Sequence, residues 1–245
     1  MARPLILIVI VVLGAGPLAG CKSGGSGDDV AAQAAAVASC EYAQGYSLEC
    51  PAYAAFLDSL DGGPDDYGLV ALVEDPAPEK RWLGATGLAR RGRQFHDDPA
   101  LRGRLLEAAR GEVDPAAAKA LGAALARTQI RRMQPADAPD AALLGEERAA
   151  LERLASEHPL PAMRAALLAE LLGYGGDAWF DFTDQRLGND TDAEVRRAGL
   201  AAFMSADPAR ASEVCAIWQR HADADPDEQT AAAAAKLRTT WGHCR

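Results

Sequence analysis

A short helix-opening motif recurs from near Tyr67 to the C-terminus and restricts what this chain can fold into. In each copy an aspartate or an X-Pro pair leads into a run of alanine and leucine, and an arginine marks the start of that run in the clearest copies, at 75–81, 158–164 and 190–196. Weaker copies begin at Asp114 and Asp225. The arginine position falls at 81, 118, 164, 196 and about 230, in steps of 37, 46, 32 and 34. A period of this size is typical of stacked helical hairpins.

The chemistry of the motif explains why it starts a helix. An aspartate oxygen caps the first backbone N–H groups, and proline presets φ for the first helical residue. Thr191 with Glu194 fits a capping box. A first helix is expected before each copy, at 67–73, 99–110, 142–156, 177–187 and 208–221. The longest step has room for a loop insertion at 133–139.

Composition supports an all-α fold. Hydrophobic residues make up 49% of the chain but aromatic residues only 6%, so alanine and leucine supply most of the apolar side chains. Both are strong helix formers, whereas the β-branched residues that favour sheets are scarce after residue 20. The 14 prolines and 23 glycines must therefore separate many short helices.

The motif lines Asp-Pro-Ala-Pro-Glu-Lys-Arg and Asp-Ala-Glu-Val-Arg-Arg-Ala-Gly-Leu-Ala-Ala-Phe resemble those of HEAT and HEAT-like repeats. The resemblance implies an α-α superhelix, a HEAT-like solenoid of about five helical hairpins, over residues 65–245. It also implies a protein-binding scaffold, since most members of the family have that role. One branch, of the PBS-lyase type, works on bilin chromophores, but the features that its chemistry needs are not found in this sequence.

The N-terminus has the layout of a secretory signal. Arg3 precedes a short apolar run, and Leu18-Ala19-Gly20 ends in Cys21. The pattern resembles a bacterial lipobox, which implies a signal peptide at 1–20 and acylation of Cys21. A transmembrane helix is the alternative, but Gly and Pro interrupt the run at about half of the 20 residues that a span needs. Lys22 follows the cysteine in place of an inner-membrane retention aspartate, so the outer membrane is favoured.

The Gly/Ser-rich residues 21–29 then read as a lipidated tether, followed by an N-terminal helical hairpin at 30–64. Its first helix is expected from Val30 to about Tyr42, and its second from Pro51 to the breakers that begin at Asp61. Cys40 and Cys50 would link the two helices.

Four cysteines remain after Cys21, in two pairs at opposite ends of the folded region. An exported chain meets an oxidising compartment, so the disulfides Cys40–Cys50 and Cys215–Cys244 are expected, each stabilising by roughly 2.5 to 3.5 kcal/mol in the chain-entropy model. The alternative at the C-terminal end is a zinc site made of Cys215, His221, His243 and Cys244. The disulfide is favoured because neighbouring cysteines oxidise readily there. No metal or cofactor is therefore expected.

Charge is unevenly distributed along the chain, whose net charge is −10. Residues 28–79 carry eleven acidic and no basic side chains, residues 80–132 twelve basic and five acidic, and residues 133–245 eleven basic and nineteen acidic. Neighbouring layers of a stack would neutralise one another, which is the favoured explanation. The alternative is a basic band that receives an acidic partner. Its candidate residues are Arg90, Arg91, Arg93, Arg127, Arg131 and Arg132. Nucleic acid is excluded as a partner of an acidic, exported chain.

The repeated arginines allow two interpretations. Arg81, Arg164 and Arg196, with Arg197 beside the last, could form a ladder in which each bonds an acidic neighbour in the next repeat, or a row of donors on the inner surface. The ladder is favoured because the stability of a solenoid is largely a sum of nearest-neighbour interfaces. The large aromatic residues are expected in the core. They are Trp82, Trp179, Phe180 and Trp218. If Trp179 or Phe180 were exposed, it would be the best candidate for an interface anchor.

No catalytic motif is found. The sequence lacks a His-Glu-x-x-His pair, a phosphate loop and a Gly-x-Ser-x-Gly elbow, and its four histidines are scattered, His96 in a turn and His158 at a capping position. The sequence therefore predicts a non-enzymatic, membrane-anchored lipoprotein of the bacterial cell envelope that binds a protein or peptide. The alternatives are an accessory or lyase-like enzyme that binds a small ligand, which a deep pocket with converging residues would support, and a purely structural envelope protein.

Overall fold

The structure, a computed structural model, describes residues 27–42, 45–60, 66–92, 98–129 and 141–244. Every regular element within these ranges is a helix, so the expected all-helical class is confirmed for them. The α-helices are α1 (Gly27–Val37), α2 (Pro51–Ser59), α3 (Asp66–Val73), α4 (Pro78–Arg91), α5 (Pro99–Gly111), α6 (Pro115–Gln129), α7 (Ala141–Glu157), α8 (Pro161–Gly175), α9 (Phe180–Asn189), α10 (Ala193–Ala202), α11 (Ala211–Ala224) and α12 (Glu228–Thr240). Short 3₁₀ helices precede α9 and α11, at Gly176–Trp179 and Pro208–Arg210.

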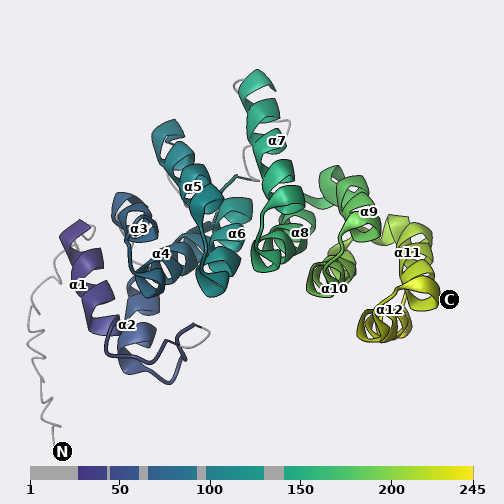
Figure 1. Cartoon of the computed structure of the whole chain (residues 1–245), viewed down its shortest axis with the longest axis horizontal. Helices are drawn as coiled ribbons and strands as arrows, with labels where there is room; N and C mark the ends of the chain where they lie inside the picture. The colour runs from purple at the N-terminus through teal and green to yellow at the C-terminus, as the bar shows by residue number, and fades with distance from the viewer. Residues whose placement is uncertain (1–26, 43–44, 61–65, 93–97, 130–140, 245) are drawn as a thin grey trace, which may run out of the picture.

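The helices form two layers of an arch (Figure 1). The odd-numbered helices make the first layer, on the outside of the arch, and the even-numbered helices make the second layer, on the inside. Each odd-numbered helix from α3 onward packs against the helix that follows it, and α4, α6, α8, α10 and α12 pack side by side in chain order. The most extensive contacts of each second-layer helix from α4 onward are therefore with its own hairpin partner and with the adjacent second-layer helices.

Proline and aspartate set the starts of the second-layer helices, as the motif predicts. Proline is the first residue of α4, α6 and α8, while Asp192 and Asp227 cap α10 and α12 with their side chains. The expected capping box of Thr191 with Glu194 is wrong. Asp192 is the cap, and its carboxylate accepts from the N–H groups of Glu194 and Val195 at 2.8 and 3.3 Å.

Close helix packing depends on small residues at specific points. A Cβ on Gly84 of α4 would lie 2.6 Å from the carbonyl oxygen of Leu69 and 2.8 Å from Leu72 Cβ, so glycine lets α4 press directly onto α3. Gly176 ends α8 with φ of 60°, which is the helix stop expected from the local glycines.

The N-terminal hairpin differs from expectation in the length of its first helix. Its first helix ends at Val37 rather than near Tyr42, because the chain turns there to bring Cys40 to Cys50. The hairpin shares its apolar core with the helices that follow it. One continuous apolar cluster extends from Val30 in α1 to Val195 in α10, and a second one extends from Leu172 to Trp241.

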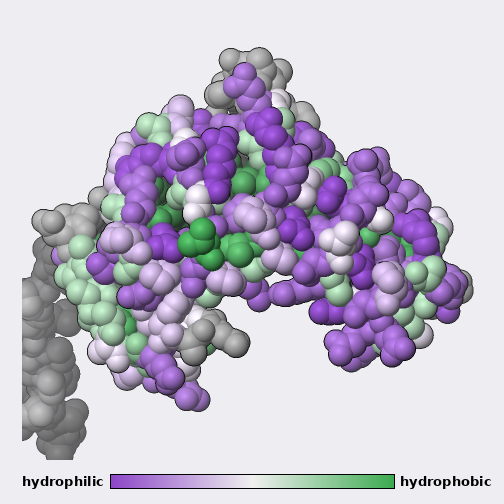
Figure 2. All heavy atoms as spheres, viewed as in Figure 1, coloured by the Kyte–Doolittle hydropathy of each residue, from purple (hydrophilic) through white to green (hydrophobic). Residues whose placement is uncertain are grey.

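Hydrophilic residues dominate the face of the molecule shown in Figure 2. Green surface is confined there to small areas between helices, and paler green covers α1, whose exposed residues are mainly alanine. Within the described ranges, no helix has the length and the apolar character to cross a bilayer. The expected signal peptide, the lipid site at Cys21 and the tether up to residue 26 lie outside the described residues, as does the loop at 133–139.

Candidate functional site

The motif arginines bridge successive helix-opening turns. Arg164 reaches Asp190 of the next turn with Nε and Nη2 at 2.9 and 3.0 Å, and donates Nη1 to the carbonyl oxygen of His158 in its own turn at 2.6 Å. Arg196 does the same one step further along, with both oxygens of Asp225 at 3.0 and 2.7 Å. Arg81 binds Glu112 in the same bidentate way, with both contacts at 2.8 Å. These donors are therefore used within the stack, in the ladder arrangement.

Burial and hydrogen bonding act in opposite directions on the carboxylates of this ladder. Burial alone would raise the pKa of Asp190, but the hydrogen bonds from Arg164 and from the Asp192 N–H hold that pKa below its usual value. The same balance lowers the pKa of Glu112 and takes the pKa of Asp225 to about 2, where His221 adds a further hydrogen bond. These carboxylates are therefore ionised partners of the arginines at neutral pH.

The ladder has one break, between α6 and α8. Ala118 stands at the arginine position of α6, and the acidic position of the next turn is His158. The histidine donates Nε2 to the carbonyl oxygen of Ala109 at 2.9 Å and accepts from the Leu160 N–H at 3.1 Å. Loss of the cation and loss of the carboxylate thus coincide at one interface.

Arg197 and the residues of the expected basic band have different environments. Arg197 pairs with Asp227 at 2.9 Å, Arg91 with Asp66, and Arg127 with Glu170 at 2.7 Å. Arg90 is exposed on the second layer. Arg93, Arg131 and Arg132 lie outside the described residues, as does His96. Neutralisation between neighbouring layers accounts for Arg91 and Arg127.

The large aromatic residues also differ in their environments, because three are buried and one is only half-buried. Trp179, Phe180 and Trp218 are at most 2% exposed, so neither Trp179 nor Phe180 can be an interface anchor. Trp82 was expected in the core, and this prediction is wrong in part, because its ring is only half-buried and lines a groove. The reason is its place directly after Arg81, on the side of α4 that faces away from α3.

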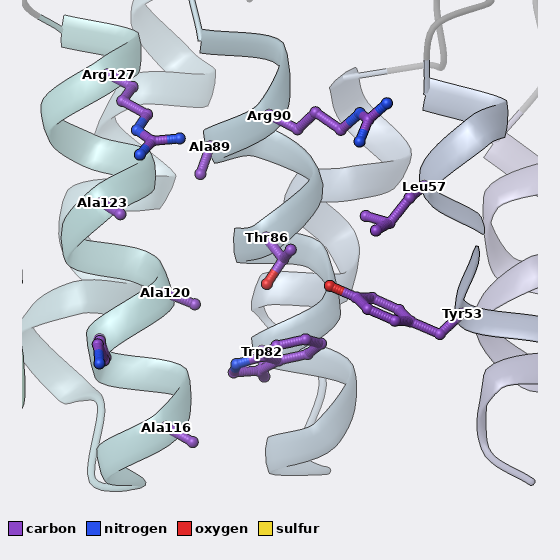
Figure 3. A pocket seen from close by; sticks show the side chains of 11 residues that line it. Tyr53, Leu57, Trp82, Thr86, Ala89, Arg90, Ala116, Ala120, Ala123 and Arg127 are labelled. Carbon is purple, nitrogen blue, oxygen red and sulfur yellow. The ribbon is translucent and has the colours of Figure 1, made fainter. Parts of the chain in front are cut away.

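The groove lies on the second layer, between α2, α4 and α6 (Figure 3), and has a volume of about 620 Å³. That volume is in the range of pockets that bind ligands. Tyr53 and Leu57 line it from α2, with a larger set from α4 and α6. That set is Trp82, Thr86, Ala89 and Arg90 of α4 with Ala116, Lys119, Ala120, Ala123 and Arg127 of α6.

The disulfide loop at 40–50 positions the aromatic end of the groove. Tyr46 and Tyr53 lie with ring centroids 5.2 and 5.5 Å from Trp82. Gly45 rests on the indole with φ of 106°, and a Cβ there would be 2.7 Å from the ring. Tyr42 donates its hydroxyl to Asp114 at 3.0 Å and so joins the loop to the start of α6. One side of Trp82 is thereby fixed, and the other lines the groove.

The charged groups that line the groove are all cations. They are Arg90, Lys119 and Arg127. Arg127 is held from outside by Glu170 and lies over the Tyr174 ring at 5.1 Å. Burial raises the pKa of Tyr53, although the nearby charge of Arg90 acts against this shift. The arrangement offers aromatic rings, small apolar side chains and cations, which are groups that bind apolar side chains and anions.

The residues of this groove were not predicted to lie together, although a pattern in the sequence connects four of them. Trp82 and Lys119 each follow the arginine position of their repeats, and Arg90 and Arg127 are both nine residues after it. Residues that share a register in stacked hairpins lie side by side on one layer. Reading the motif register beyond its arginine would have placed these four together.

The cysteines of the C-terminal end are joined to each other, Cys215 to Cys244, as Cys40 is to Cys50, so both expected disulfides are present. Cys215 and Cys244, two ligands of the alternative zinc site, are therefore used in a disulfide. His221 bonds Asp225 at 2.9 Å, and His243 makes an edge-to-face contact with the Trp241 ring.

Comparison of the chain with protein-family models, with curated proteins and with solved structures gives no match. Function must therefore be argued from the groove and the ladder themselves.

Proposed function

We propose that this chain is a lipid-anchored protein of the bacterial cell envelope that binds another protein on the second layer of a HEAT-like solenoid. The observation that carries the proposal is the groove between α2, α4 and α6. The arginine ladder is occupied by carboxylates of the stack, whereas the groove presents Trp82 and Lys119 at a surface. Such a contrast between satisfied and available groups distinguishes a binding surface from structural contacts.

The solenoid assignment rests on the repetition of one unit. Equivalent residues lie at equivalent points of most hairpins. An acidic side chain accepts a backbone N–H in the turn before α4, α6, α10 and α12, and an arginine of α4, α8 and α10 bridges to the next turn. Stacked units of this kind make an extended inner surface, which HEAT-like scaffolds use to bind proteins. An α-α superhelix is therefore the arrangement that we infer.

The anchor rests on the residues before the described part of the chain. Cys21 follows small residues at the end of an apolar run, and the two disulfides fit an oxidising compartment. Acylation of Cys21 would hold the solenoid at a membrane, and Lys22 favours the outer one. No transmembrane helix is needed for this attachment, because multiple acyl chains bind a bilayer stably.

A small-ligand enzyme is the second candidate, since the groove is large enough for a small molecule. Its lining residues contain no carboxylate, cysteine or histidine, which are the usual acids, bases and nucleophiles. The chemistry of the groove therefore favours binding over catalysis. A purely structural envelope protein is the third candidate and predicts no stoichiometric partner.

Photo-cross-linking in intact cells tests the proposal. A diazirine amino acid at Ala116, which lines the groove, is compared with one at Glu107, whose side chain is 76% exposed on α5 in the first layer. We expect one adduct of defined mass at Ala116 and none at Glu107, and loss of both the adduct and membrane attachment in Cys21→Ser. Absence of an adduct at Ala116, or the same adducts at both positions, would refute the scaffold function.

A further inference from the structure

We propose that the groove between α2, α4 and α6 binds a proline-rich segment of the partner protein in the polyproline II conformation, with two prolines three residues apart on its apolar surfaces. The inference rests on the proposed scaffold function and specifies the chemistry of the partner. It follows from the hydrogen-bond donors of the groove, from its apolar surfaces and from the spacing between them.

Two hydroxyl groups face one another in the middle of the groove. Tyr53 extends from α2 and Thr86 from α4, and their oxygens point toward each other (Figure 3). Neither oxygen has a hydrogen-bond partner among the residues that the structure describes. Tyr53 is only 6% exposed, and burial raises the pKa of its phenol, so it remains a hydrogen-bond donor at neutral pH. A donor in this position favours an occupant that supplies an acceptor.

The polar groups beside these hydroxyls are also donors. The indole nitrogen of Trp82 lies at the edge of the ring that points toward α6, and it too lacks a hydrogen-bond partner within the described part of the chain (Figure 3). Lys119 of α6 shares the motif register of Trp82 and has an exposed ammonium group. None of the described residues that line the groove is a carboxylate. The positive ends of these N–H and O–H dipoles therefore attract carbonyl oxygens.

A polyproline II segment supplies such carbonyl oxygens. This conformation has no internal hydrogen bonds, and proline carries no backbone N–H that would need an acceptor. An α-helix uses its own carbonyl groups, so a helical partner would leave Tyr53, Thr86 and Trp82 without acceptors. An extended segment without proline brings one N–H with each residue, whereas the described side chains of the lining offer only the two hydroxyl oxygens as acceptors. Hydrogen bonding therefore selects a proline-rich segment.

Two apolar surfaces lie on either side of the hydroxyl groups, and each consists of one large side chain and two alanines. They are Trp82 with Ala116 and Ala120, and Leu57 with Ala89 and Ala123 (Figure 3). Aromatic and small apolar residues of this kind are what proline rings pack against in grooves for proline-rich segments. The first surface is rigid, because Gly45 and Tyr46 of the disulfide loop rest on the indole.

The spacing of the two surfaces matches one turn of polyproline II. Ala89 follows Trp82 by seven residues, and Ala123 follows Ala116 by seven residues as well. Seven residues of α-helix span about 10 Å. Three residues of polyproline II span about 9 Å and return to the same side of that helix. Prolines three residues apart therefore reach both surfaces and leave the carbonyl groups between them at Tyr53 and Thr86.

The test uses synthetic peptides with blocked ends and the full chain in detergent micelles. The first peptide carries prolines at its fourth and seventh positions and alanine or serine elsewhere. A second carries them at the fourth and sixth positions, on different sides of the polyproline II helix, and a third has alanine in place of both. Trp82 reports binding through its fluorescence, because Trp179, Trp218 and Trp241 are at most 8% exposed. We expect the first peptide to bind and to shift the emission, and each of the others to bind at least about fivefold more weakly.

Calorimetry on variants tests the three donors. Tyr53→Phe, Thr86→Val and Trp82→Phe each remove one donor and keep a side chain of similar size, and each should weaken binding of the first peptide about fivefold. The three are measured separately, so the other two still test the inference if one fails to fold. Tyr67→Phe in α3 and Thr239→Val in α12 remove hydroxyl groups outside the groove. They are the matched controls and should change the affinity less than about twofold.

The cellular adduct locates the segment in the partner itself. The partner peptide that is cross-linked at Ala116 should contain two prolines three residues apart. A cross-linked peptide without proline, failure of the first synthetic peptide to bind, equal binding of the second or third, or unchanged affinity in all the folded donor variants would overturn the inference. Tighter binding of a glutamate-rich peptide without proline would overturn it in favour of an acidic segment. All these results leave the scaffold function standing, whereas absence of any adduct at Ala116 in the otherwise wild-type chain refutes that function.

Discussion

Equivalent positions of the second-layer helices carry different residues in the two halves of this protein. In the N-terminal half, the residues that follow the motif arginine position are Trp82 and Lys119, and both line a groove. In the C-terminal half the corresponding residue of α10 is Arg197, which pairs with Asp227. The position nine residues after the motif arginine is Arg90 or Arg127 in the first half, but Gly173 or Ser205 in the second.

The difference shows that the residues of each hairpin fall into two groups with separate roles. Residues that bridge turns or pack between helices set the stack, and they can be satisfied identically in every repeat. Residues on the side of the second helix that faces away from the first layer affect the stack little, so they can line a groove in one half and form ion pairs such as Arg197–Asp227 in the other. Stability and binding should therefore be separable, because contacts within the stack set the free energy of unfolding in both halves, whereas binding should be confined to the N-terminal groove.

The largest effect is expected from the C-terminal disulfide. Replacing Cys215 and Cys244 together by serine opens a loop of 29 residues and should lower the free energy of unfolding by about 3.6 kcal/mol in the chain-entropy model. The same change at Cys40 and Cys50 opens a loop of 10 residues and should cost about 2.7 kcal/mol. Urea denaturation of the two variants checks the order. The reverse order would show that the aromatic cluster over Trp82 adds to the stabilisation by the N-terminal link.

The ladder should matter nearly as much. Arg196→Ala leaves Asp225, whose side chain is 1% exposed, without its guanidinium, and should cost about 3 kcal/mol. Lys119→Ala, in the groove, is the matched control and should cost less than about 0.5 kcal/mol. Denaturation in urea measures both. Similar losses in the two variants would contradict the division between structural and available cations.

Acid should weaken the same contact. The pKa of Asp225 is lowered in the folded state to about 2, from an unfolded value near 3.8. A depressed folded pKa stabilises the protein above the unfolded value, and this stabilisation is lost as the pH falls through the folded value. The difference between wild type and Arg196→Ala should therefore shrink by about 2 kcal/mol from pH 5 to pH 2. A difference that stays constant with pH would place the effect of Arg196 outside this ion pair.

The smallest effect concerns the break in the ladder. Ala118→Arg alone would place a cation in a buried position next to a histidine and should destabilise the protein. Adding His158→Asp recreates the pair found at the other turns and should recover about 1 kcal/mol, measured as the coupling in a double-mutant cycle. Zero coupling would show that the geometry between α6 and α8 no longer accommodates the bridge.

Local chemistry explains what could be predicted from the sequence. Proline and aspartate set the helix starts, and cysteines at the two ends paired with their neighbours. The capping box failed because Thr191 and Asp192 are adjacent and both can cap, so only the position of the backbone N–H groups decides between them. Trp82 was partly misassigned because small residues, Gly84, Ala85 and Gly87, make up much of the buried face of α4, which leaves the direction of its one aromatic residue open.

Alanine-methyl NMR tests the central claim most directly, because alanines line both halves of the inner layer. The full chain carrying ¹³C-labelled alanine methyl groups is titrated with the protein recovered as the adduct at Ala116. The account predicts shifts at Ala116, Ala120 and Ala123 of α6, with no shift at Ala201 of α10 or Ala232 of α12. Shifts at Ala201 and Ala232 while the α6 methyl groups stay unchanged would contradict it, as would equal shifts along the whole layer.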